Sequence, residues 1–218
     1  MIDVVIATRN RHKFVELKRL LPIRGIRWHS LAEFPEAPRV AEHGRTCEAN
    51  AIKKARVVAR ATGMLALADD SGIEVEALGW GPGVRSARFA GAHGDDRANN
   101  AKLLQALNRL PMARRRARYR CVLALADPRD VLAVAHGTWN GRIARGPKGH
   151  RGFGYDPLFL VPRFGKTIGQ LPSSIKQRLS HRAVAARRMR PILKRLVQRA
   201  VSDRRDSGAD RWDPARAA

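Results

Sequence analysis

The chain has 218 residues, 44% of them hydrophobic, which is enough to bury a sizeable core as one domain or two small lobes. Its 43 lysines and arginines exceed its 19 aspartates and glutamates, and the net charge of +24 attracts polyanions such as nucleic acids and nucleoside triphosphates. Aromatic residues make up only 6%, too few for the stacking surface of a single-strand binder, so we expect nucleic-acid binding only as a non-specific consequence of the charge.

The cysteines and the lack of long apolar stretches bear on the compartment. Cys47 and Cys121 lie far apart without a Cys-x-x-Cys spacing, which excludes a disulfide framework and a cysteine-rich zinc site and favours a reducing compartment. The N-terminal stretch MIDVVIATRN lacks the features of a signal peptide, and no window approaches the roughly 18 apolar residues of a membrane span. We expect a cytoplasmic protein without a membrane partner.

The first half of the chain predicts strands and helices in alternation. Residues 3–8 form a β-branched run, and residues 14–21 carry apolar side chains at helical spacing until Pro22 ends the helix. Residues 47–62 repeat the helical spacing, with Gly63 at the position of a C-cap glycine, and lead into an apolar strand at 65–70. A turn-rich stretch follows at 79–91.

The second half predicts a helix within 97–111, two strands at 118–128 and 131–144, and a glycine-rich loop at 146–160. Residues 180–198 indicate a helix that is kinked or broken near Pro191. From Val201 the chain is polar and aperiodic. Because strands and helices alternate only loosely, we predict a mixed α/β sheet in a domain over 1–200, with a disordered basic tail over 201–218.

The loop TRNRHK, residues 8–13, stands between the first strand and the first helix. Backbone N–H groups and the helix dipole favour an anion there, and Lys13 adds a formal positive charge. The Walker pattern is absent, and many loops between a strand and a helix hold residues such as Thr8 and Asn10 merely as turn and cap residues. The loop is therefore a candidate phosphate site whose alternative is a plain helix cap.

Two adjacent acids end the run LALADDSGIEV at residues 65–75. Because successive side chains of a strand point to opposite faces, Asp69 and Asp70 cannot both face one site. One acid is expected to hold Mg²⁺ or orient a water molecule, while the other is exposed or caps a turn. An Asp-Ser-Gly turn is an equally good interpretation of these residues.

Two further segments are weak candidates on their own. Phe153 lies between glycines in GFGYDP, which leaves room for a flat ring to stack on it, although many ordinary loops share this pattern. His181 and Arg182 could donate hydrogen bonds to a carbonyl oxygen, whereas the alternative makes Ser180 a helix N-cap and the basic pair a solvated surface.

In chain order, TRNRHK, EHGRTCEANAIKKA, ADDSGIEV, GPGVRSARFAG, RGFGYDP and KQRLSHR resemble the inosine triphosphate pyrophosphatase family. The resemblance spans the chain up to the last predicted helix. It implies an elongated mixed α/β fold of two lobes with the active-site cleft between them, usually as a homodimer. It also implies Mg²⁺-dependent hydrolysis of dITP, ITP and XTP to the monophosphate and pyrophosphate, which removes deaminated purines from the nucleotide pool.

The resemblance also implies the role of each site residue. Asp70 would bind Mg²⁺ and act as the general base that activates water for attack on the α-phosphorus, and Glu42 would be the second metal-binding acid. Selectivity would depend on donors such as Arg182 that satisfy the six-position oxygen of the base, since the amino group of adenine would face those donors. The implied substrate-binding residues are Thr8, Arg9, Asn10, Arg11, His12, Lys13, Ser71, Phe153, Gly154, Tyr155, Asp156, Lys176, His181 and Arg182.

Three positions depart from the family pattern. Ala49 stands where glutamate usually precedes the asparagine, Arg85 replaces an aromatic residue, and Gln170 replaces glutamate. Two rival functions stay open: a related pyrophosphatase for other modified or pyrimidine nucleotides, and a basic nucleic-acid binder that has kept the fold without turnover. The second rival has no need for Asp70, Glu42 and Lys13 together.

Overall fold

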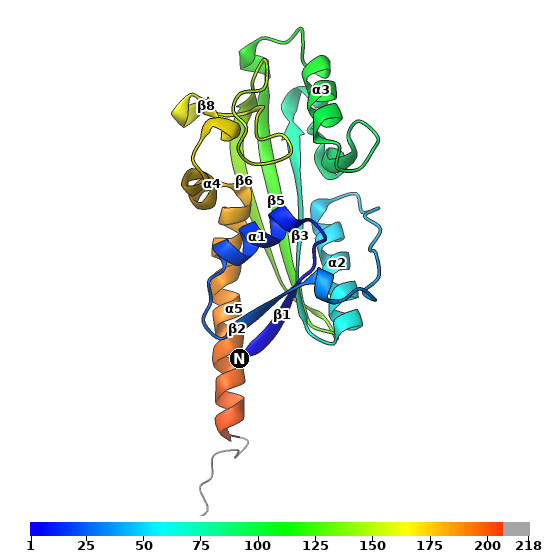
Figure 1. Ribbon diagram of the computed structural model, residues 1–218, viewed down its shortest axis with the longest axis vertical. Helices are drawn as coiled ribbons and strands as arrows, with labels where there is room; N and C mark the ends of the chain where they lie inside the picture. The colour runs from blue at the N-terminus through cyan, green and yellow to red at the C-terminus, as the bar shows by residue number, and fades with distance from the viewer. Residues whose placement is uncertain (207–218) are drawn as a thin grey trace, which may run out of the picture.

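The computed structural model describes residues 1–206 as an elongated molecule built on one curled, eight-stranded mixed sheet (Figure 1). The strand order is β2-β1-β3-β5-β6-β7-β8, and β4 pairs separately with β3. Pairing is parallel among β2, β1 and β3 and antiparallel from β3 onward. The mixed α/β fold expected from the sequence is confirmed.

The strands are β1 (Ile2–Ile6), β2 (Ile26–Ser30), β3 (Leu65–Val75), β4 (Gly81–Pro82), β5 (Arg116–Ala126), β6 (Val131–Ile143), β7 (Phe159–Val161) and β8 (Lys166–Thr167). The α-helices are α1 (Arg11–Leu20), α2 (Cys47–Thr62), α3 (Asp96–Ala106), α4 (Ser173–Leu179) and α5 (His181–Asp206). Short 3₁₀ turns complete the described chain at Leu31–Glu33, Glu76–Leu78, Gly83–Arg88, Met112–Arg114, Pro162–Phe164 and Ile168–Gln170.

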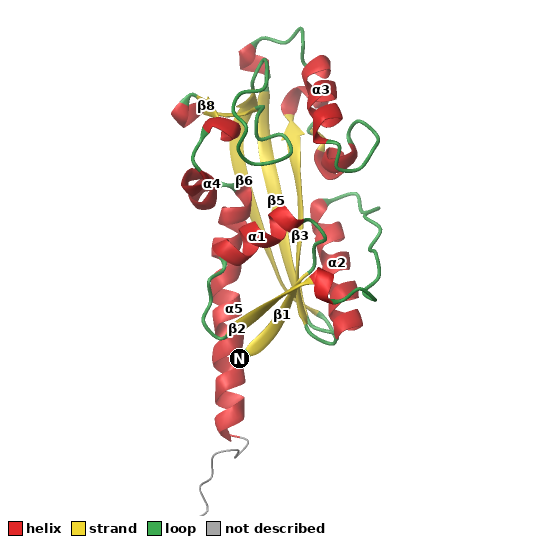
Figure 2. Ribbon diagram, viewed as in Figure 1, coloured by secondary structure: helices red, strands yellow, loops and turns green. Residues whose placement is uncertain are grey.

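The long strands β3, β5 and β6 run through both lobes of the molecule, so each lobe packs its own core on them. In one lobe, α5 and α1 cover one face of the sheet and α2 covers the other (Figure 2). In the other lobe, a separate core joins Leu103 and Leu107 near α3 to Tyr119 and Phe159 on the strands. The midpoint of β3, where the two acids lie, is thus the junction of the lobes.

The period of two predicted for the 65–70 strand is observed in its packing. Leu67 lies in the core beneath α5, while Ala66 and Ala68 lie in the core beneath α2. Leu67 and Asp69 therefore share one face of β3, and Ala68 and Asp70 share the other. The small alanines let α2 approach the sheet closely.

The strand does not turn after the acids, contrary to the Asp-Ser-Gly interpretation. Pairing with β5 continues without interruption from Ala66–Ala126 to Val75–Ala117. Gly72 is needed for close approach, because a Cβ there would lie 2.2 Å from the carbonyl oxygen of Gly83. Backbone pairing therefore overrides the local turn preference of this segment.

Of the kink or break expected near Pro191, the break does not occur. α5 runs through Pro191 to Asp206, because Met189 and Leu193 on either side are buried against the sheet and this packing offsets the roughly 3 kcal/mol cost of an internal proline. Residues 201–206 consequently continue the helix, and the rest of the tail prediction, 207–218, lies outside the described residues. Within residues 1–206, no helix has both the length and the apolar character that crossing a bilayer requires.

Candidate active site

Asp69 and Asp70 occupy the middle of β3 and make contacts on opposite faces of the sheet. Asp69 contacts Lys13 of α1 and Arg182 of α5, whereas Asp70 contacts Asn50 of α2. Both acids are buried, with 1% and 5% of their surfaces exposed. A buried charge is costly unless it is paired, so each acid must be explained by its partners.

Asp69 is fully enclosed by donors. Its Oδ1 lies 2.5 Å from Nζ of Lys13, and its Oδ2 lies 2.8 Å from Nε of Arg182. The Cys121 thiol also contacts Oδ2 at 3.2 Å, and Oγ of Ser71 lies 3.3 Å from Oδ1. Burial raises the pKa of this carboxyl, but Arg182 and Lys13 outweigh burial and hold the pKa well below its usual range. One acid of the pair was expected to be exposed or to cap a turn, and for Asp69 this is wrong, since Asp69 is buried and binds two cations.

Asp70 has weaker partners. Its Oδ2 accepts a hydrogen bond from Asn50 Nδ2 at 3.2 Å, and Nζ of Lys54 lies 3.5 Å from its Oδ1. Lys54 is held more closely by Glu42, at 2.8 Å, and by the carbonyl oxygen of Asp69, at 2.7 Å. Burial outweighs Lys54, so the pKa of Asp70 is raised. A buried carboxyl of raised pKa in a cleft suits a general base.

The loop that precedes α1 combines the two interpretations given to it. Asn10 is the N-cap of α1, since its Oδ1 accepts from Lys13 N at 3.1 Å, and Thr8 Oγ1 accepts from Asn10 N at 3.2 Å. The capped loop nevertheless borders a cavity of about 290 Å³, which we call the phosphate cavity. Its charged and polar lining includes Thr8, Arg9, Asn10, Lys13, Glu42, Lys54, Asp70 and Ser71.

Two residues of the same loop lie outside the phosphate cavity. Arg11 lines a separate depression with Phe14 and Ser30. His12 stacks on Phe153, with ring centroids 5.3 Å apart and planes 16° from parallel. Of the residues in TRNRHK, the structure thus brings four to the phosphate cavity and one to the aromatic ring.

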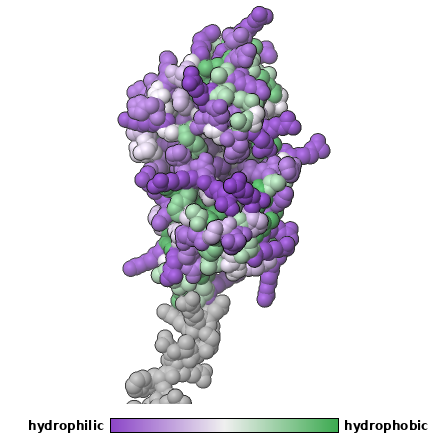
Figure 3. Space-filling model, turned by 45° about the vertical axis from the view of Figure 1, so that its right-hand side comes forward, coloured by the Kyte–Doolittle hydropathy of each residue, from purple (hydrophilic) through white to green (hydrophobic). Residues whose placement is uncertain are grey.

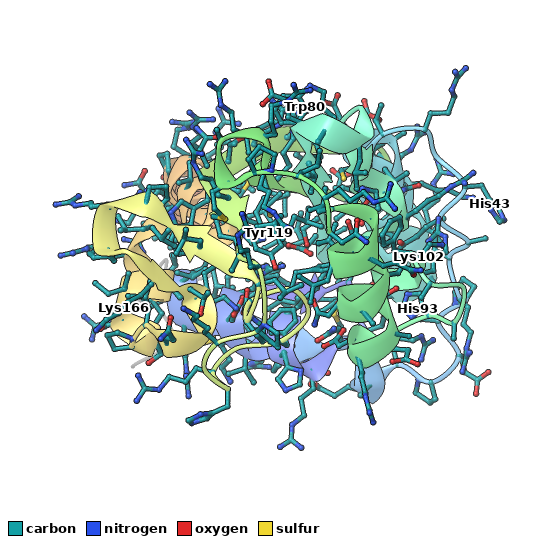
Figure 4. All side chains as sticks on the ribbon, turned by 90° about the horizontal axis from the view of Figure 1, so that it is seen from above. His43, Trp80, His93, Lys102, Tyr119 and Lys166 are labelled. Carbon is teal, nitrogen blue, oxygen red and sulfur yellow. The ribbon has the colours of Figure 1, made fainter. Side chains whose placement is uncertain are left out.

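A second cavity, which we call the base cavity, adjoins the first at Asn10, Lys13 and Ser71. It has a volume of about 130 Å³. Tyr119, which lines this cavity, lies at the centre of the molecule seen from above (Figure 4). The predicted substrate-binding residues of GFGYDP and of the SHR region all line this cavity: Phe153, Gly154, Tyr155, Asp156, Lys176, His181 and Arg182.

The loop that carries Phe153 is held from several sides. Asp156 Oδ2 accepts from Phe153 N at 3.0 Å and pairs with Lys176 Nζ at 2.7 Å. Tyr155 donates its hydroxyl to the carbonyl oxygen of Ser86 at 2.8 Å. The Lys176 ammonium lies 4.3 Å from the centroid of the Phe153 ring. These contacts fix the ring as a platform rather than leaving it on a free loop.

Gly154 joins this loop to α3. Its N–H donates to Asp96 Oδ2 at 2.7 Å, and its carbonyl oxygen accepts from Asn100 Nδ2 at 3.0 Å. Both partners belong to the lobe opposite α1. The platform is therefore held by the lobe that faces the phosphate loop.

His181 opens α5 inside the base cavity and is buried. Its ring stacks on Tyr119, with centroids 4.6 Å apart and planes 11° from parallel. Burial, helped by the adjacent Arg182, lowers the pKa of His181 well below its usual value, so the imidazole stays neutral. Its Nδ1 has no hydrogen-bond partner among the described residues. A buried polar atom without a partner in a cavity suits contact with a ligand.

Ser180, read from the sequence as a plain N-cap, does cap this helix: its Oγ accepts from Ala183 N at 3.1 Å. The capping and the functional interpretations of SHR are thus compatible, as they are for TRNRHK.

Three residues of the site, Glu16, Asn50 and Lys54, were not predicted from the sequence. Glu16 joins two predicted binding residues, since its carboxylate contacts Lys176 at 2.7 Å and Arg182 at 2.5 Å. Asn50 and Lys54 bind Asp70 from α2. The helical spacing of three or four residues places Glu16 on the face of Lys13, and Lys54 on the face of Asn50, which is the signal that would have found them.

Residues 4–192 match the family model described as the Ham1 family. The chain belongs to the Ham1 family. This membership confirms the resemblance drawn from the ordered motifs.

Curated members of the Ham1 family cover nearly the whole chain. A protein of Desulforamulus reducens named dITP/XTP pyrophosphatase is 50% identical over 195 residues, which cover 89% of this chain and 97% of the relative. One of the same name from Rhodopirellula baltica is 48% identical over 199 residues, covering 91% and 96%.

A solved HAM1 protein from Coxiella burnetii has a TM-score of 0.82 and 40% identity, covering 89% of this chain and all of that one. A Ham1 protein from Staphylococcus aureus has a TM-score of 0.79 and 38% identity, covering 89% and 99%.

The structure accounts for two of the three departures from the family pattern. Ala49 N is bound by the Thr46 side chain at 3.1 Å, so the start of α2 is capped without a glutamate at 49. Glu48 pairs with His136 at 3.3 Å and is not among the partners of Asp70. Gln170 keeps a capping role, because its Oε1 accepts from Thr167 N at 3.1 Å.

Proposed function

We propose that this Ham1-family chain hydrolyses dITP, ITP and XTP to the monophosphate and pyrophosphate, and so removes deaminated purines from the nucleotide pool. The observation that carries the proposal is the junction of two cavities at the midpoint of β3, one beside an aromatic platform and one beside Asp70. A nucleotide has the same two-part character, a flat base and a polyanionic chain. The names of the Desulforamulus and Rhodopirellula relatives support the same substrates.

The residues of the phosphate cavity suit hydrolysis at the α-phosphorus. Asp70 would accept a proton from the attacking water, because its raised pKa makes it a better base than an exposed aspartate. Asp69 holds the Lys13 ammonium at 2.5 Å, which leaves the other ammonium protons to bind phosphate oxygens. Catalysis by this arrangement consists mainly of positioning and charge neutralisation.

The donor set of the phosphate cavity fits Mg²⁺, which we propose as the cofactor. Glu42 and Asp70 present carboxylate oxygens on either side of the Lys54 ammonium. Among the described residues no cluster of three or more metal-binding side chains occurs, and Mg²⁺ characteristically takes one or two carboxylates together with water and substrate phosphates. Glu42 and Asp70 would hold the ion, which would neutralise phosphate charge and acidify a bound water molecule.

The base cavity offers donors and acceptors for the purine edge. Arg182, expected from the sequence to contact the base, already donates to Asp69, Glu16 and Ser71, which leaves two of its five N–H groups. We propose that these N–H groups and the neutral His181 recognise the six-position oxygen. Adenine presents an amino group there, and a buried donor facing another donor costs about 1–3 kcal/mol. The pocket therefore favours a six-oxo purine over adenine.

The remaining expectations concern the assembly and the compartment. We propose that the chain forms the homodimer that the family resemblance implies. Light scattering of the purified protein tests this by measuring whether its mass is that of two chains or of one. The two cysteines are free, Cys47 half-buried and Cys121 buried, which supports a reducing compartment and the cytoplasm.

A substrate panel tests the proposed function. Pyrophosphate release is measured with dITP, XTP, dATP, dGTP and dTTP in the presence of Mg²⁺, for the wild type and for Asp70→Asn. We expect release from dITP and XTP, near-complete loss in the variant, and little release from the other nucleotides. Equal rates for dTTP would favour the broader pyrophosphatase, and no release from any nucleotide together with tight, salt-sensitive DNA binding would favour the nucleic-acid binder.

A further inference from the structure

A third cavity, of about 480 Å³, opens beside the phosphate cavity and has no role in the function proposed above. It lies between the loop ahead of α2 and the 3₁₀ turn Gly83–Arg88. His43, on its rim, points outward at the edge of the molecule (Figure 4). Its charged and apolar lining consists of Glu42, His43, Arg45, Val84, Arg85 and Arg88.

The cavity is continuous with the site through shared walls. Glu42 and Val84 line both this cavity and the phosphate cavity. The base cavity shares Asn10, Lys13 and Ser71 with the phosphate cavity, but it shares no lining residue with the third cavity. The third cavity therefore adjoins the phosphate cavity and not the base cavity.

The arginines of this cavity form no ion pair among the described residues, unlike the lysines nearer the reaction centre. Lys13, Lys54 and Lys176 each pair with a carboxylate at 2.5–2.8 Å. Among the side chains that the structure describes, no carboxylate lies within ion-pair distance of Arg45 or Arg85. The same holds for Arg88.

Glu42 is the one acid in the lining of this cavity, and it is already engaged. Its carboxylate is bound by Lys54 at 2.8 Å, and its carbonyl oxygen accepts from Arg88 Nη2 at 2.9 Å. The hydrogen bond to Arg88 fixes that guanidinium at the cavity wall and leaves its other N–H groups free for a ligand. Hydrophilic residues prevail over the face of the molecule in Figure 3.

We propose that Arg45, Arg85 and Arg88 form a binding site for a pyrophosphate group in the third cavity, beside the phosphate cavity. The proposal rests on the proposed function, because pyrophosphate is both the terminal part of the substrate and the product released. Guanidinium groups bind phosphate oxygens through two parallel N–H bonds, which suits three arginines around two linked phosphates.

Direct binding tests the site without relying on turnover. Inorganic pyrophosphate is titrated calorimetrically into the wild type, Arg85→Gln, Arg45→Gln and the conservative Arg85→Lys. Lys166→Gln is the matched control, because it removes the same charge from the opposite edge of the molecule (Figure 4). We expect the two glutamine variants to bind about threefold to tenfold more weakly, Arg85→Lys to fall between, and the control to match the wild type. Equal weakening in the control, or unchanged binding in Arg85→Gln, would overturn the proposal.

Kinetics with dITP separates the two sources of the pyrophosphate group. If the site holds the terminal phosphates of the substrate, KM for dITP rises in Arg85→Gln while the affinity for dIMP is unchanged. If it holds only the free product, KM is unchanged and inhibition by added pyrophosphate weakens; both results support the site. Wild-type protein that binds pyrophosphate through these arginines but releases none from dITP would refute the proposed function alone.

Discussion

Replacement of Asp69 by asparagine should destabilise the fold strongly, whereas the same replacement of the adjacent Asp70 should cost little stability or none. Asp69 has a lowered pKa, so its ionised form stabilises the fold at every pH above its unfolded value of 3.8, and that stability is lost as the pH falls toward the lowered value. Asp70 has a raised pKa, so its ionised form destabilises the fold near neutral pH.

The magnitude follows from the partners that each variant leaves behind. Asp69→Asn removes a carboxylate that binds Lys13 and the fully buried Arg182, and loss of one partner from a buried pair costs about 3–5 kcal/mol. For a protein of this size the melting temperature should fall by roughly 6–20 °C. In Asp70→Asn, Lys54 keeps its ion pair with Glu42 at 2.8 Å. The free energy of unfolding of this variant should therefore fall by less than about 1 kcal/mol or should rise.

Urea denaturation at pH 7.5, followed by tryptophan fluorescence, measures both free energies of unfolding. Pyrophosphate release from dITP is measured on the same preparations. We expect Asp69→Asn to be strongly destabilised, and Asp70→Asn to be folded and inactive. Wild-type stability in Asp69→Asn, or a greater loss in Asp70→Asn than in Asp69→Asn, would refute the assignment of a structural role to the first acid and a chemical role to the second.

Three further predictions concern other parts of the site. Phe153→Ala should raise KM for dITP by roughly tenfold with a smaller effect on kcat, because base stacking contributes about 1–3 kcal/mol. The control Phe153→Tyr keeps the ring and should stay close to wild type. Steady-state kinetics measures both variants, and an unchanged KM in Phe153→Ala would exclude stacking. Gly137→Ala should lower the free energy of unfolding by roughly 1–3 kcal/mol, since a Cβ there would lie 1.9 Å from the carbonyl oxygen of His181; a thermal melt equal to wild type would contradict this close approach. Because buried His181 resists protonation, its contribution to the free energy of unfolding should fall by up to about 1.4 kcal/mol per pH unit below pH 6.5. His181→Gln should therefore reduce the slope of the free energy of unfolding against pH in urea denaturation, and an unchanged slope would show that the imidazole is charged in the fold.

The sequence predicted what depends on local periodicity. The alternation of side chains along a strand correctly placed Asp69 and Asp70 on opposite faces, and helical spacing with Gly63 as the C-cap correctly located α2. The positions of the motifs along the chain also predicted the family. These features are readable because each depends on residues close together in the sequence.

The errors arose where distant residues decide the local structure. Asp69 is buried because Arg182, 113 positions later, pairs with it. The strand continues past the acids because β5 pairs with it, and α5 passes Pro191 because its buried face packs on the sheet. Glu16 carries no motif of its own, and its role emerges only when α1, α4 and α5 meet.

Hydrolysis of dITP in water enriched in oxygen-18 tests the central claim most directly, because it reports which phosphorus the water attacks. The account predicts that the label enters dIMP, that the pyrophosphate released is unlabelled, and that Asp70→Asn abolishes both products while remaining folded. Release of inorganic phosphate, or label in the pyrophosphate, would contradict attack at the α-phosphorus beside Asp70.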